Sequence, residues 1–185
     1  PWYSQFTGQG KRIAGQTGGR MGETYNPLLM NGDPSRSDFH LPGLELPDHL
    51  PSSRLADRVQ LSDRLASIDA GGYAKTNDPL AVHRERAFAL LADVRVAKAV
   101  DLRLEPVAER DRYGRGKFGQ SLLLARRLVE AGVSLVTVNW DDDSRDDKVS
   151  PFWDTHHDNF LQLKERLCPN FDRAISSFLE DLDER

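Results

Sequence analysis

The stretch "FWDTHHDNF", residues 152–160, places an aspartate, two histidines, a second aspartate and an asparagine between aromatic residues. Asp154 and His156 are two positions apart, so their side chains project to the same side if this loop is extended. A carboxylate oxygen and an imidazole nitrogen are both common ligands of a divalent cation. The pair therefore predicts part of a metal site, because such sites usually use three or four protein ligands.

The same residues also fit the polar start of a helix. Thr155 or Asp154 could accept hydrogen bonds from the exposed N–H groups of a first turn, with both histidines half exposed on it. The spacing leaves both interpretations open. Their proximity makes Asp158 and Asn159 candidates for orienting the ligands by hydrogen bonds. The other histidines, which have no partner at ligand spacing, are interpreted as surface or packing residues: His40, His49 and His83.

Two further motifs suggest chemistry but fail on their context. "DDDSRDD", residues 141–147, has Asp146 where a calcium-binding EF-hand loop needs glycine and leads to Phe152 where that loop needs glutamate. It is interpreted as a solvated acidic loop. "GRGKFG", residues 114–119, fits the G-x-G-x-x-G pattern of dinucleotide sites, but the preceding "AERDRY" is no strand, so a plain helix-entry turn is predicted.

The elements that would position the histidine-containing loop change character along the chain. Residues 1–51 contain most of the glycine and proline and are predicted to be loop-rich. Residues 52–132 form a helical region, because apolar residues recur there at spacings of three and four. Pro79 after a capping aspartate and Gly132 after an apolar run mark a helix start and a helix end. The predicted helices run from 52 to about 71, 79 to about 92, 94 to 100, 105 to 112 and 116 to 131.

The helix predicted from 116 to 131 is the most clearly amphipathic. Its apolar face carries four residues at spacings of four, three and four, and this face is expected to pack on a sheet: Phe118, Leu122, Ala125 and Val129. The charged groups 110–112 and 126–127 are interpreted as solvated helix faces with weak local ion pairs.

Residues 133–185 are predicted to form a strand, the candidate metal loop and a final helix. "VSLVTVNW", residues 133–140, is apolar and β-branched, as in a strand buried on both faces. A lone strand cannot satisfy its backbone, so its partner strands are expected to be missing and all three regions to belong to one incomplete domain. The final helix is expected to be interrupted at Pro169 and to resume with four apolar residues on one face: Phe171, Ile175, Phe178 and Leu182.

Composition excludes several classes of partner. The chain has 25 Lys and Arg residues interleaved with 29 Asp and Glu, a net charge of -4, and therefore no basic footprint for nucleic acid. No apolar run approaches the ~18 residues of a membrane span. The single cysteine, Cys168, cannot form an internal disulfide and is interpreted as a small buried hydrophobe.

Two long motifs resemble a known family. "RDRYGRGKFGQSLLLARRLVEAGVSLVTVNW" and "FWDTHHDNFLQLKERLCPNFDRAISSFLEDL" closely resemble the bacterial family of unknown function DUF1501. Softer matches are "GGRMGETYNPLLM", "LPSSRLADRVQLSDRL" and "YAKTNDPLAVHRERAFALL", so the likeness covers most of the chain. This family is placed among the sulfatase-like proteins of the alkaline phosphatase superfamily.

The resemblance implies a fold and a chemistry. It implies an α/β class, namely part of an α/β/α sandwich with one clear central strand in a helix-rich fragment. It also implies a divalent metal (zinc, manganese or calcium) held by Asp154 and His156, a small anionic ester as substrate, and a nucleophile outside this chain. His157 stands where family members commonly have glycine, and it could contact the substrate or have no role in the site. The resemblance further implies a periplasmic or secreted location.

Three functional hypotheses follow. The first is a metal-dependent hydrolase of the sulfatase or phosphatase type, of which this chain is an internal fragment. The second is a non-catalytic binding or cell-surface protein on the same scaffold, because a fold does not establish an activity. The third is a helical interaction module that dimerises through apolar helix faces. The sequence does not predict the oligomeric state.

Overall fold

The computed structural model describes residues 17–41, 50–69, 79–140 and 153–185. The described residues are rich in helix and include no β-strand. The chain divides into two units, residues 1–31 with 46–92, and residues 32–45 with 93–185. In the described ranges, no helix is both long enough and apolar enough to cross a membrane.

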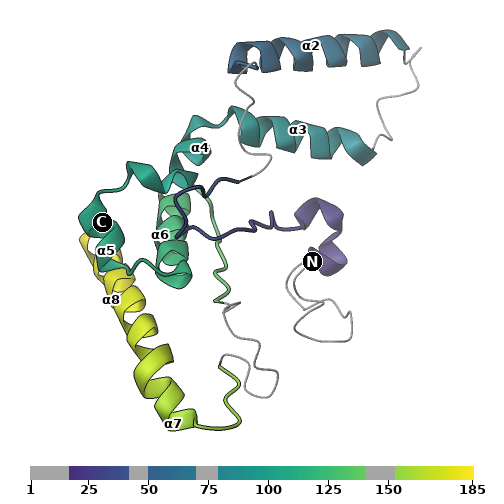
Figure 1. Cartoon of the computed structure of the whole chain (residues 1–185). Coiled ribbons are helices and arrows are strands. Elements are labelled where there is room, and N and C mark those ends of the chain that lie inside the picture. Colours follow the sequence, from purple (N-terminus) through teal and green to yellow (C-terminus); the bar gives the residue numbers. More distant parts are fainter. Residues whose placement is uncertain (1–16, 42–49, 70–78, 141–152) are drawn as a thin grey trace. The chain divides into compact units, whose positions relative to one another are not determined.

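The first unit contains two antiparallel helices that lie side by side (Figure 1), α2 (Ser52–Asp69) and α3 (Pro79–Ala92). Both helices were predicted, and α3 begins at the proline as expected. The predicted continuation of the first helix to about residue 71 lies outside the described residues. The described part of the loop-rich segment holds two short 3-10 turns, η1 (Gly19–Met21) and η2 (Glu23–Tyr25).

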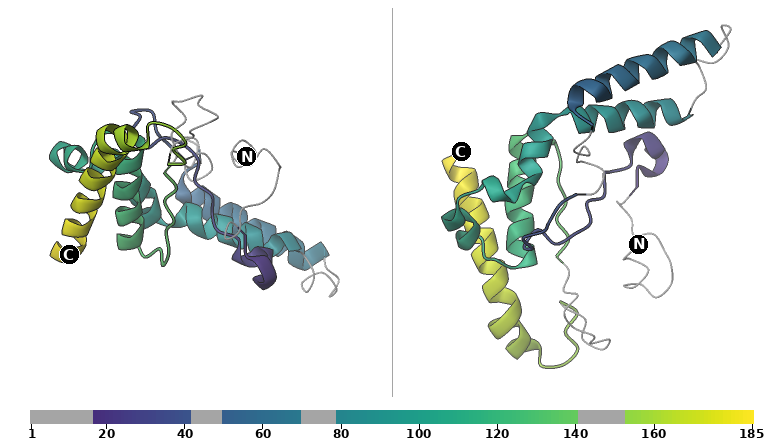
Figure 2. Two further views of the ribbon diagram at one scale, coloured as in Figure 1. Left: turned by 90° about the horizontal axis from the view of Figure 1, so that it is seen from below. Right: turned by 45° about the horizontal axis from the view of Figure 1, so that its top comes forward.

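The second unit is built around α6 (Lys117–Glu130), which lies beside α8 (Cys168–Glu184) in both views of Figure 2. Helix α4 (Val94–Val100) packs on α6, and the turn η3 (Leu102–Leu104) leads to α5 (Val107–Arg112), which packs on α8. These helices match the predicted ones within a few residues. The core is formed mainly by buried leucines and alanines from these elements, together with one tyrosine: Ala99, Leu102, Tyr113, Leu122, Leu123, Leu124, Ala125, Leu128, Leu167 and Ala174.

The predicted strand at residues 133–140 is wrong, and with it the α/β/α sandwich. The structure has no strand there or elsewhere in its described parts. Gly132 has a φ of 103°, and the Val133 N–H bonds Leu128 O, which closes the end of α6 as the predicted glycine cap requires. The chain then continues without regular structure, and Leu135 is 83% exposed. A β-branched run becomes a strand only when a neighbour satisfies its backbone, and the described residues supply none.

The predicted interruption of the last helix at Pro169 is also wrong. The chain passes from α7 (Asn159–Gln162) through the π-helical turn η4 (Leu163–Leu167) directly into α8. Pro169 lies in the first turn of α8, directly after the π-helical turn, so the helical run continues through it.

The buried face of α8 differs from the predicted apolar face. Phe171 and Leu182 are 39% and 55% exposed. The buried positions on α8 are instead Ala174, Ser177 and Asp181, at spacings of three and four. Small side chains on this face let α8 approach its neighbours closely. The buried aspartate is tolerated because Arg112 from α5 and Arg126 from α6 donate hydrogen bonds to it.

Four side chains, Arg112, Tyr113, Arg126 and Asp181, form a buried ion cluster between α5, α6 and α8. Asp181 is 2% exposed and accepts hydrogen bonds from Arg126 Nη1 at 2.6 Å, from the Tyr113 hydroxyl at 2.7 Å and from Arg112 Nη2. Burial raises the pKa of Tyr113. The interpretation of Arg126 as part of a solvated helix face is therefore wrong, since its side chain is only 3% exposed.

Glu105 extends this arrangement toward α4. Its Oε1 lies 2.8 Å from Arg126 Nη2 and also accepts a hydrogen bond from Arg127 Nη1. Arg127 donates in addition to the carbonyl oxygens of Ala99, at 2.8 Å, and Lys98. Arg127 thus satisfies the carbonyl groups at the end of α4, where a cation also complements the helix dipole.

The position of Glu105 predicts how stability responds to acid. Burial raises its pKa, but the ion pairs with Arg127 and Arg126 outweigh burial and hold the pKa below the ordinary 4.5. A carboxyl group with a lowered pKa stabilises the folded state above its ordinary pKa, and this contribution is lost as the pH falls through the folded pKa. Glu105→Gln should therefore flatten the fall in the free energy of unfolding at pH values below 4.5, as measured by urea unfolding across that pH range. Glu184→Gln, at an exposed position, should leave the slope unchanged.

Close packing in the turn between α5 and α6 explains why the "GRGKFG" motif is present. A Cβ on Gly119 would lie 2.7 Å from Gly114 O and closer still to Tyr113 O, so only glycine fits there. The fully buried Gln120 fixes the same turn. Its Nε2 donates to Gly114 O at 2.8 Å and to Arg110 O at 2.9 Å, while its Oε1 accepts from Arg110 Nε at 2.7 Å.

Candidate metal centre

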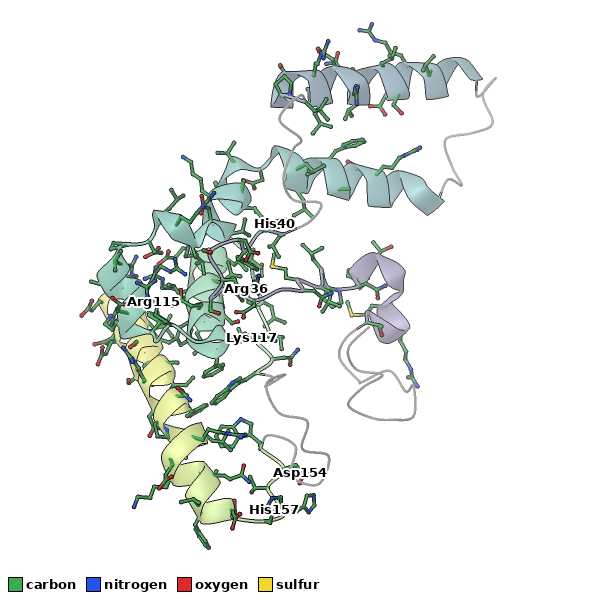
Figure 3. The ribbon with its side chains drawn as sticks, in the orientation of Figure 1. Arg36, His40, Arg115, Lys117, Asp154 and His157 are labelled. Carbon is green, nitrogen blue, oxygen red and sulfur yellow. The ribbon has the colours of Figure 1, made fainter. Side chains whose placement is uncertain are left out.

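The loop that carries the predicted ligands leads into α7, and Figure 3 labels Asp154 and His157 on this loop. Asp158 is the residue before the helix and adopts a left-handed conformation, with φ of 52°. Its side chain does not cap the helix. The Thr155 hydroxyl donates to Asn159 Oδ1, and Gln162 Nε2 donates to His157 O at 3.2 Å. The loop is thus tied to the start of α7 by side chains other than the predicted ligands.

Asp154 and His156 face each other. The Oδ2 atom of Asp154 lies 3.1 Å from Nε2 of His156, and the two side chains are 71% and 59% exposed. Two atoms that bind one zinc ion at about 2.0–2.2 Å, with an angle near 90–110°, lie about 3.0–3.5 Å apart. The observed separation therefore suits a shared cation as well as the direct contact. Their role as ligands stays a prediction.

The donor chemistry fits part of a metal site. One carboxylate oxygen and one imidazole nitrogen suit zinc or manganese better than calcium, which takes mainly oxygen ligands. The described parts of the chain bring no third His, Cys, Asp or Glu into a group with this pair. Zinc sites in which catalysis occurs hold three protein ligands, so the pair supplies two of them at most. The acidic loop at residues 141–147, the other candidate for cation binding, lies outside the described residues.

The residues predicted to assist the ligands lie at the start of α7. The Asn159 side chain accepts a hydrogen bond from the Thr155 hydroxyl, and the Asp158 side chain does not cap the helix. Both residues are exposed. His157 follows the pair directly and is also exposed, and its contact with a substrate stays a prediction.

Sequence reasoning missed an aromatic cluster directly beside the pair, formed by Phe118, Trp140, Trp153 and Phe171. The Phe118 and Trp140 rings stack at 4.2 Å between centroids, with Phe171 nearly parallel at 6.0 Å and 6.3 Å. Trp153 meets Trp140 edge-on at 5.3 Å and Phe171 at 6.1 Å. The available signal was the pair of tryptophans, Trp140 and Trp153, that flank residues 141–152 in the sequence.

Comparison with known proteins places the chain in a family. A family model described as "Protein of unknown function (DUF1501)" matches residues 3–185. No curated protein and no solved structure matches the chain. The matched region includes both the aromatic cluster and the Asp154–His156 pair. The chain therefore belongs to the DUF1501 family, proteins of unknown function.

Proposed function

We propose that this chain is part of a metal-dependent hydrolase that acts on an anionic ester, of the sulfatase or phosphatase type. One observation carries the proposal, namely the 3.1 Å approach of Asp154 Oδ2 to His156 Nε2 on an exposed loop. Residues 153–156, "WDTH", match an element of the DUF1501 family, and the placing of that family among the sulfatase-like proteins supports the choice of ester. Zinc or manganese fits the two donors best.

The residues of this chain would bind and orient rather than attack. Asp154 contributes negative charge that offsets a divalent cation, and His156 contributes a neutral nitrogen donor. A bound cation would neutralise an anionic ester and stabilise charge on its oxygens. His157, which is exposed and next to the pair, would donate a hydrogen bond to an ester oxygen. The nucleophile is assigned to residues outside this chain.

The proposal is tested first by metal binding in the full-length protein. His156→Ala and Asp154→Asn should each weaken the Kd for zinc or manganese at least about 100-fold, because loss of a direct ligand should cost no less than loss of a residue that orients one. Isothermal titration calorimetry gives the Kd, and elemental analysis gives the metal content. His40→Ala is the control, because His40 is an exposed histidine that bonds Asp38 O instead. Unchanged metal affinity in both ligand variants would rule the site out.

Turnover separates the hydrolase from its alternative. The full-length protein should hydrolyse an aryl sulfate or an aryl phosphate, and His156→Ala should abolish this hydrolysis. His157→Ala should lower turnover while metal content stays unchanged, since His157 is assigned to the substrate. A protein that binds metal tightly but hydrolyses neither ester would favour the non-catalytic binding function.

A further inference from the structure

We propose that Trp153 is a positioning residue, which fixes the backbone from which Asp154 and His156 project and thereby sets the cation affinity of the pair. This inference rests on the proposed function. The indole of Trp153 packs edge-on against both Trp140 and Phe171, at 5.3 Å and 6.1 Å between centroids, with interplanar angles of 78° and 84°. Edge-to-face packing at these distances is a preferred aromatic geometry.

The side chains of the predicted ligands are exposed. Their side chains are 71% and 59% exposed, so little packing restrains them. The loop is instead held at its two ends. Trp153, next to Asp154, packs into the aromatic cluster at one end, and the Thr155–Asn159 and Gln162–His157 hydrogen bonds tie the other end to α7. A ligand pair that is ordered before the cation arrives loses less entropy on binding.

The cluster also connects the loop to the helical core. Phe118 lies in the first turn of α6 and Phe171 in the first turn of α8, and α6 and α8 pack against each other. Stacking of Phe118 on Trp140 at 4.2 Å completes the contact surface on which Trp153 lies. Through Trp153, the position of Asp154 therefore depends on rigid helices rather than on the loop alone. Groups that orient metal ligands typically change metal affinity 10- to 100-fold.

The test compares two substitutions of Trp153 in the full-length protein, with cobalt(II) as the probe. Trp153→Leu should weaken the cobalt Kd about tenfold and change the visible absorption of the bound ion, because the ligand geometry relaxes. Trp153→Phe should restore the Kd to within about threefold of the original, since a smaller ring can still pack edge-on. Phe160→Leu is the matched control, because Phe160 is 85% exposed and outside the cluster, and its Kd should not change.

A further control separates positioning from general stability. Leu123 is fully buried in the helical core, so Leu123→Ala should lower the thermal unfolding midpoint at least as much as Trp153→Leu does. It should leave the cobalt Kd and spectrum unchanged. If Leu123→Ala weakens cobalt binding as much as Trp153→Leu, or if Trp153→Leu leaves the Kd unchanged, the positioning role is overturned.

A measurement without metal distinguishes failure of this inference from failure of the proposed function. In the metal-free protein, the ring signals of His156 in a proton–carbon NMR spectrum should shift with Trp153→Leu and return with Trp153→Phe, because the His156–Asp154 contact depends on the loop. Absence of cobalt binding in the unmodified protein would overturn the proposed function. If the His156 signals do not change with Trp153→Leu, the positioning role is overturned while the proposed function is not.

Discussion

Gly119→Ser is expected to lower the free energy of unfolding by about 3 kcal/mol, at the upper end of the usual cost of overpacking. Any Cβ at this position would meet the backbone oxygens of Tyr113 and Gly114 at less than contact distance. Backbone atoms cannot rotate away as the end of a side chain can. The Tyr113 ring is 1% exposed and its hydroxyl bonds Asp181, so a shift of this turn would also disturb the buried ion cluster.

Gly116→Ser provides the matched control, the same substitution three residues earlier. A Cβ on Gly116 meets no atom within 4 Å, and Gly116 is the residue before the first turn of α6, where serine is favoured. Its unfolding free energy should stay within about 0.5 kcal/mol of the original or rise slightly. Urea unfolding of both variants gives the comparison. Equal midpoints for the two serine variants would contradict a steric role for the close approach at Gly119.

Asp181→Asn is expected to cost about 3 kcal/mol, because it removes a buried carboxylate that both Arg112 and Arg126 contact, and Glu105 alone then offsets less of the buried positive charge. The side chains of Asp181 and Arg126 are 2% and 3% exposed. Asparagine keeps the size of aspartate, so the loss would come from charge and hydrogen bonding rather than from a cavity. The amide would also place two N–H donors among three groups that already donate, from Arg112, Tyr113 and Arg126.

Two companion variants make this prediction specific. Asp183→Asn, on the exposed face of the same helix, should change the unfolding free energy by less than about 0.5 kcal/mol. The double variant Asp181→Leu with Arg126→Met should lose less than the sum of its two single variants, because no unpaired charge remains between α6 and α8. Strict additivity in this cycle, measured by urea unfolding, would mean that Asp181 and Arg126 are not coupled.

The sequence predicted the helices well because their signals are local. Pro79 marks the start of α3, and Gly132, with its φ of 103°, marks the end of α6. Such residues act through their own backbone geometry and do not depend on distant neighbours. The strand at residues 133–140 failed for the opposite reason. Its β-branched residues have a local preference for extended backbone, but a strand also needs hydrogen bonds from another segment. The residue types in 133–140 do not indicate whether such a segment is present.

Burial of the charged residues could not be predicted from the sequence. Arg126 has a local carboxylate four residues ahead, Glu130, which suggests a weak surface pair. Its closer partner is Asp181 on α8, 55 positions along the chain. The buried face of α8 could not be predicted for the same reason. Ser177 and Asp181 are polar residues typical of an exposed face, and their partners Arg112 and Arg126 lie far earlier in the chain.

The candidate site was partly predictable. A spacing of two in an extended loop implies that Asp154 and His156 share a side, and the two side chains do face each other. Whether they bind a metal stays a prediction. The support of the loop by Trp153 could not be predicted, because the cluster joins rings from α6, α8 and both ends of residues 141–152.

The buried ion cluster also constrains the order in which the chain can refold. Its bonds join residues separated by 69, 68 and 55 positions, so they form only after a long stretch of chain has closed. Helices α4, α5 and α6 can assemble earlier through contacts near in sequence. Docking of α8 is therefore expected to follow the assembly of these helices, and until it happens Arg126 lacks the carboxylate of Asp181.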